Sequence, residues 1–63
     1  MIRFVFEGEA TEKDIPAHGN AVGPAALDVA GVDPGVVFHV RQTSATTWIV
    51  TTAGETVTAE VIE

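Results

Sequence analysis

The feature that most constrains the fold is the alternation of apolar and polar residues on both sides of Ala53 and Gly54. A period of two is typical of a β-strand with one buried face. Two residues ending in glycine are a common hairpin turn. A turn at these positions pairs Val50 with Val57 and Trp48 with Ala59. The valines and the indole then share one face and most threonines take the other, which supports this register.

A third β-like run, at residues 36–42, precedes this hairpin. Its apolar residues join the face of Trp48 only if the connecting loop has an odd number of residues. A three-residue loop at 43–45 satisfies this condition, because it pairs Val40 with Trp48. An even loop would remove several side chains from the core, at about 1.5–3 kcal/mol each. We therefore predict the odd loop.

The N-terminal half predicts one strand and one short helix. Residues 2–7 alternate as a strand does. Residues 7–14 hold four carboxylates and precede Pro16, which disfavours helical angles, so a solvated loop is expected there. Pro24 suits the first helical position and Gly31 suits a C-terminal cap. A short helix is therefore expected at residues 23–31, and the small residues that fall on the side facing the sheet are Val22, Ala25, Ala26 and Val29.

These elements predict an α+β fold in a single domain over residues 1–63, in the order β-α-β-β-β. The sheet is expected to be four-stranded and mixed, with the short helix packed on one face. Because the helix connects the first two strands, we expect those strands to be parallel with a right-handed crossover. The threonine-rich last strand, 55–62, is expected at a sheet edge. A chain of 63 residues has only a small core.

The second face of the predicted sheet has no helix to cover it, yet it carries apolar side chains beside basic ones. Three interpretations remain open: scattered surface residues, an interaction surface, or a curled sheet that buries this face as well. The interaction surface would use Val37, His39, Arg41, Thr47, Ile49 and Thr51.

Charge and composition exclude several function classes. Three basic and nine acidic residues give a net charge of 3 − 9 = −6, which argues against nucleic-acid and anionic-membrane binding. No apolar run approaches the roughly 20 residues of a membrane-spanning helix, and the N-terminal residues show no signal-peptide pattern. A cytoplasmic location is therefore expected. The absence of cysteine excludes disulfides and thiolate metal sites.

Chemistry-bearing residues form no recognisable catalytic or metal-binding pattern. His18 and His39 lack the spacing of metal ligands. Ser44, the only serine, has no base at a recognisable distance in the sequence. Residues 19–23 are rich in glycine but lack the lysine and hydroxyl of a phosphate-binding loop. We therefore expect no catalytic residue, no metal and no cofactor, and do not expect an enzyme.

The leading hypothesis is a non-enzymatic protein-interaction module that binds itself or another protein through a sheet face or a strand edge. One alternative is a small-ligand-binding protein whose pocket lies at a subunit interface. Another is an acidic decoy of a basic nucleic-acid-binding surface, although nine acids dispersed over several segments fit that function poorly.

Overall fold

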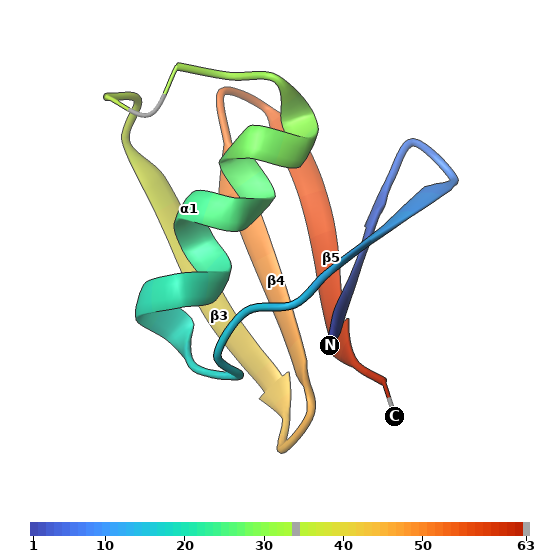
Figure 1. Cartoon of the computed structure of the whole chain (residues 1–63). Coiled ribbons are helices and arrows are strands. Elements are labelled where there is room, and N and C mark those ends of the chain that lie inside the picture. The colour runs from blue at the N-terminus through green and yellow to red at the C-terminus, as the bar shows by residue number, and fades with distance from the viewer. Residues whose placement is uncertain (34, 63) are drawn as a thin grey trace.

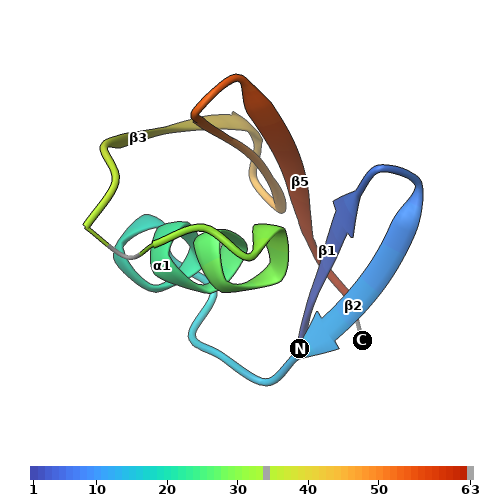
Figure 2. The ribbon, with the colours of Figure 1, turned by 90° about the horizontal axis from the view of Figure 1, so that it is seen from above.

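A computed structural model describes residues 1–33 and 35–62. Within them lie one helix and five strands: β1 (Ile2–Phe6), β2 (Glu9–Lys13), α1 (Gly19–Ala30), β3 (Phe38–Ser44), β4 (Thr47–Thr52) and β5 (Glu55–Val61). The strands form one sheet in the order β2-β1-β5-β4-β3, and every neighbouring pair is antiparallel. The helix lies on one face (Figure 1), and the sheet curls around it (Figure 2). The α+β class is confirmed.

The predicted count of four strands is wrong because the acidic segment forms β2. A two-residue turn at Glu7 and Gly8 reverses the chain, with φ of 51° and 82°. The turn at Ala53 and Gly54 has nearly the same angles, 49° and 79°. Two successive positive φ values suit the right-handed twist of a hairpin. The carboxylates are compatible with a strand because four of the five β2 residues are exposed at the sheet edge.

The predicted mixed sheet with a parallel first pair is also wrong, as is the edge position of the last strand. The first hairpin places β2 beside β1, so the connection through α1 starts at one sheet edge and ends at the other, in β3. The last strand, β5, lies at the centre between β1 and β4. The edges are therefore β2 and β3.

The predicted pairing of the last two strands is confirmed: Val50 lies opposite Val57 and Trp48 opposite Ala59. For β3 and β4 the predicted face is right and the register is wrong by two residues. Val40 lies opposite Val50 rather than Trp48. A bulge between Gln42 and Ser44, followed by a two-residue turn at 45–46, supplies the odd offset that the sequence required. Strand β3 also begins two residues later than predicted.

The helix begins at Gly19, five residues before the predicted start at Pro24. Its start follows His18, which has extended backbone angles. Pro24 lies inside the helix and removes one backbone hydrogen bond. Gly31 caps the C-terminus as predicted, with φ of 71°, and its amide donates to a carbonyl of the last turn. Residues 19–23 therefore form helix, although they precede Pro24.

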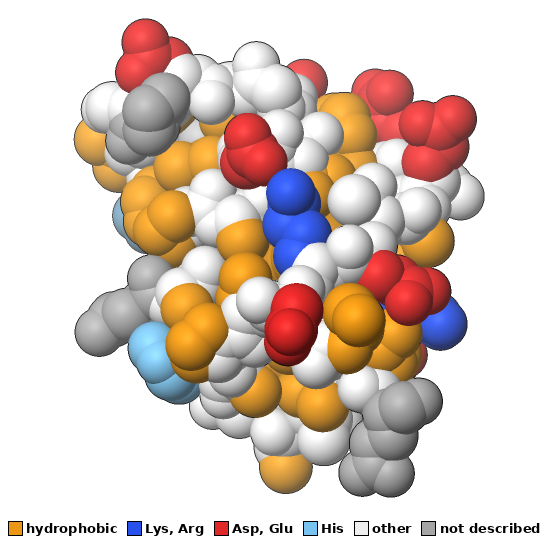
Figure 3. Space-filling model, viewed as in Figure 1, with side chains coloured by type: hydrophobic (Ala, Val, Ile, Leu, Met, Phe, Trp, Pro, Cys, Tyr) orange, Lys and Arg blue, Asp and Glu red, His pale blue; other side chains and the backbone are white. Residues whose placement is uncertain are grey.

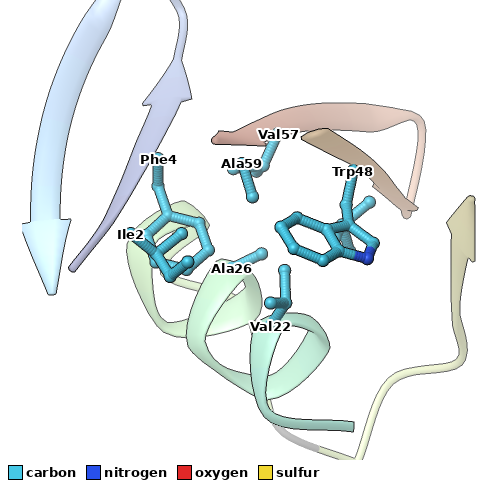
Figure 4. Close-up of a cluster of buried hydrophobic side chains, with 8 residues drawn as sticks. Ile2, Phe4, Val22, Ala26, Trp48, Val57 and Ala59 are labelled. Carbon is cyan, nitrogen blue, oxygen red and sulfur yellow. The ribbon is translucent and has the colours of Figure 1, made fainter. Parts of the chain in front are cut away.

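The core lies between α1 and the concave face of the sheet, and Figure 4 shows its central cluster. Leu27, placed outside the predicted stripe, is only 2% exposed. The curled sheet covers a wider arc of the helix than a flat one would. Gly23 permits the close approach, since a Cβ there would lie 3.1 Å from Phe38 Cζ and 3.2 Å from Val40 Cγ2. The buried apolar residues are Ile2, Phe4, Val22, Ala26, Leu27, Trp48, Val50, Val57 and Ala59.

Candidate interaction surface on the open face of the sheet

The face of the sheet opposite α1, here called the open face, is uncovered by any element in the described part of the chain (Figure 2). Side chains alternate along each strand, so the residues between the core positions belong to it. The register aligns one open-face residue from each strand in a continuous row. From β3 to β2, that row is Arg41, Ile49, Thr58, Val5 and Ala10.

The structure brings the predicted contact residues together at the β3 and β4 side of the open face. His39 lies opposite Thr51, and Arg41 lies opposite Ile49. Thr47 is two residues before Ile49 on β4 and lies opposite a β5 residue. His39, Arg41 and Thr51 are exposed, whereas Thr47 and Ile49 are half-buried. Their role in binding remains a prediction.

Val37, the sixth predicted contact residue, lies just before β3 and is 77% exposed. Its carbonyl accepts a hydrogen bond of 3.1 Å from the hydroxyl of Thr52, which is itself buried. That bond ties the segment entering β3 to β4. The backbone of this exposed valine is therefore fixed to β4 by a hydrogen bond from a buried hydroxyl.

The acidic residues of the molecule all lie outside β3 and β4. Residues 36–54, which include β3 and β4, contain Arg41 and His39 and no acid. The remaining residues hold nine acids with Arg3 and Lys13, so their formal charge is 2 − 9 = −7. In the described residues, Arg3 pairs with Glu12 at 3.6 Å and Lys13 with Asp28 at 3.0 Å, which leaves Arg41 as the one Lys or Arg without an ion pair.

The two edge strands differ in how well they are protected against pairing with another chain. Strand β2 has five residues, of which two are glutamate and one is lysine. Short length and charged side chains discourage strand addition. Strand β3 has seven residues with one formal charge, and its bulge lies near its C-terminal end. Residues 38–42 of β3 are therefore the less protected edge.

The sequence-based prediction missed this edge because it placed the last strand there. The signal that would have found it is the pair Glu7 and Gly8, which has the same pattern as the pair Ala53 and Gly54 recognised further along. A hairpin at the first pair adds β2 and shifts the remaining strands in the sheet order. The backbone of β3 then becomes part of the candidate site.

Other chemistry-bearing residues are scattered. His18 precedes α1, whereas His39 lies on the open face. Ser44 lies at the end of β3, where its hydroxyl accepts a hydrogen bond of 3.2 Å from the amide of Thr46. Over residues 1–33 and 35–62, no three His, Asp or Glu side chains form a group suited to a metal ion. In that same part, no helix has the length and apolar character needed to cross a membrane.

One buried carboxylate oxygen has no hydrogen-bond partner among the described residues, Oε2 of Glu55. A buried acceptor without a partner costs about 1–3 kcal/mol. We expect Glu55→Thr to raise the free energy of unfolding by about 1 kcal/mol, because it removes this acceptor and retains β propensity. Urea unfolding followed by circular dichroism measures the change.

The matched control is Glu9→Thr, because Glu9 also follows a two-residue turn but is exposed on β2. That variant should change the unfolding midpoint little. A fall in stability for Glu55→Thr, with Glu9→Thr unchanged, would show that the carboxylate of Glu55 makes a stabilising contact.

Comparison with protein families, curated proteins and solved structures found no match to this chain. A function cannot be transferred from a relative, so the geometry of the sheet carries the functional argument. Its most distinctive features are the uncovered open face and the sparsely charged β3 edge beside it.

Proposed function

We propose that this chain is a non-enzymatic protein-interaction module that binds a polypeptide through the open face near β3 and through the β3 edge. The observation that carries the proposal is the grouping of His39, Arg41 and Ile49 on an uncovered face, next to a free strand edge and just after the exposed Val37. Arginine is enriched where proteins bind one another, and the fully buried centre of such an interface is more apolar than the rest of the surface.

The size of the open face indicates that face and edge act together. Five strands span about 19 Å, and a six-residue strand is about 20 Å long, which gives a sheet area of roughly 400 Å². A standard interface buries about 800 Å² on each partner. The open face alone therefore suits a weak complex, and main-chain hydrogen bonds at β3 would add to it.

The acidic-decoy hypothesis requires carboxylates gathered on one surface in the manner of duplex phosphates. Seen from the helix side, Asp and Glu side chains are dispersed among apolar ones (Figure 3). This distribution does not favour a decoy, and we do not propose it. A ligand pocket shared between subunits would require self-association, so the next experiment tests that alternative too.

Replacing Ile49 with lysine is expected to weaken association through the open face at least tenfold. The substitution places a charge within the contact surface, whereas the half-buried side chain contributes little to the core. Sedimentation velocity of the purified chain over a wide concentration range measures self-association. Urea unfolding of the same variant should give a midpoint close to that of the original chain.

Binding to a different protein is tested by a photoreactive residue at position 49 or at position 28. Asp28 is exposed on α1, on the opposite side of the molecule, and is the control. Cross-links in the native host should form from position 49 and not from position 28. Equal cross-linking from both positions, together with unchanged sedimentation of Ile49→Lys, would reject the proposed surface.

A further inference from the structure

We infer that the β3 edge receives an extended acidic segment of another protein, which adds as a sixth strand and sets a carboxylate against Arg41. The inference rests on the proposed function and specifies the chemistry of the partner. It follows from three observations: the free backbone of β3, the position of Arg41, and the separation of the acids from this edge.

The backbone of β3 offers the pairing groups. Residues 38–42 pair regularly with β4 on one side, and no described strand lies on their other side. The bulge between Gln42 and Ser44 ends the regular stretch, so the site is about five residues long. Strand addition obtains affinity from main-chain hydrogen bonds and specificity from alternate side chains.

Arg41 supplies the charge preference. It is exposed near the middle of β3 and takes part in neither of the ion pairs found in the described residues. An arginine presents its donors in a fork that matches a carboxylate. On an added strand, the residue opposite Arg41 would lie on the open face beside it.

The net charge of −6 does not cancel this preference at β3. No acid occurs in residues 36–54. The nearest strand acids, Glu55 and Glu60 of β5, are two strand spacings from β3, about 10 Å, and the acids of β2 are four spacings away, about 19 Å. The Debye length at physiological ionic strength is about 8 Å. The carboxylates of β5 and β2 both lie beyond this length from β3 and are largely screened from a ligand there, whereas Arg41 would contact the ligand directly.

A second copy of the chain is a poorer occupant. Antiparallel pairing of two β3 strands centred on Val40 sets Arg41 opposite His39, and pairing centred on Arg41 sets it opposite its own copy. Pairing of β2 with β3 brings opposite charges together but leaves a free edge at each end of the complex, which leads to an open chain of molecules. A segment of another protein can place a carboxylate opposite Arg41, which neither β3–β3 pairing does, and it does not lead to an open chain.

The test is a titration of the full chain, labelled with nitrogen-15, by capped heptapeptides that alternate valine with glutamate, lysine or threonine. The glutamate peptide should shift the amide signals of residues 38–42 and bind at least tenfold more tightly than the lysine peptide. Arg41→Glu should invert this order, and Arg41→Gln should abolish the difference. Lys13→Glu makes the same charge change on β2 and should leave the order unchanged.

Two N-methylated forms of the glutamate peptide separate strand addition from simple charge attraction. Alternate amides of an added strand point toward β3, so methylation of one set should abolish binding and methylation of the other should not. Equal binding by both forms would overturn strand addition.

The outcomes separate this inference from the proposed function. Preferential binding of the lysine peptide, with shifts of the same β3 amides, would overturn the inference that the partner is acidic. It would leave the proposed interaction surface unaffected. Shifts by the glutamate peptide at β2 instead of β3, or at neither edge, would overturn the inference. Pairing of β3 with a second copy, seen as concentration-dependent shifts of the peptide-free chain, would overturn it in favour of self-association. The proposed surface itself fails only in the sedimentation and cross-linking experiments.

Discussion

Replacing Trp48 with alanine is expected to lower the free energy of unfolding by about 3–5 kcal/mol. The indole is 4% exposed, and Figure 4 shows it beside Val22 and Ala26 of α1. Its removal leaves a cavity that the helix and sheet cannot close fully. At about 0.05–0.15 kcal/mol per residue, a chain of this length has a total stability of only about 3–9 kcal/mol. A large fraction of the variant should be unfolded at 25 °C.

Far-UV circular dichroism in urea is the appropriate measurement, because Trp48 is the only tryptophan and the variant loses its intrinsic fluorescence probe. Ile49→Ala is the matched control, since the neighbouring side chain points to the open face and is half-buried. Ile49→Ala should lower the free energy of unfolding clearly less than Trp48→Ala does. Greater damage from Ile49→Ala than from Trp48→Ala would mean that the two faces of β4 are reversed.

Phe4→Ala is expected to have an effect of similar size, about 3–5 kcal/mol. Phe4 is fully buried in β1, opposite Ala59 on β5 and Thr11 on β2. Loss of the ring removes one of the two fully buried side chains of the first hairpin, the other being Ile2, and β2 is held in the sheet only through β1. Phe4→Leu keeps an apolar side chain and leaves a smaller cavity, so it should cost less than Phe4→Ala.

Hydrogen exchange in the Phe4 variants distinguishes local from global loss of structure. In Phe4→Leu, the amides of β1 and β2 should exchange faster while those of β4 and β5 keep their protection. Val5→Ala, next along the strand and 36% exposed, should change neither stability nor exchange appreciably. Equal effects of Val5→Ala and Phe4→Ala would contradict the assignment of Phe4 to the core face.

The strands with strict alternation were predictable, and the chain reversals were only partly so. The pairing of Trp48 with Ala59 follows from a period of two around a glycine-containing turn. The same turn at Glu7 and Gly8 was missed because the carboxylates beyond it favoured a loop. Edge strands tolerate charge, so composition alone does not separate an exposed edge strand from a loop. The remaining sheet order depended on that one hairpin.

The register of β3 and the start of α1 depended on interactions that the sequence does not reveal. A bulge between Gln42 and Ser44 is equivalent to an odd loop in its effect on side-chain faces, so the two could not be separated by alternation. Pro24 favours a helix start, but packing of Val22 and Gly23 against the sheet extends the helix before it. The candidate residues on β3 and β4 depended only on the faces, which were correct.

The curl of the sheet around α1 restricts the shapes of surface that fit against its outer side. That side is convex, so a flat or equally convex surface would touch it over a narrow band and leave gaps on both flanks. A hollow surface or a single extended segment follows the curve more closely. The curvature that encloses the small core therefore also favours hollow or extended contact surfaces over flat ones.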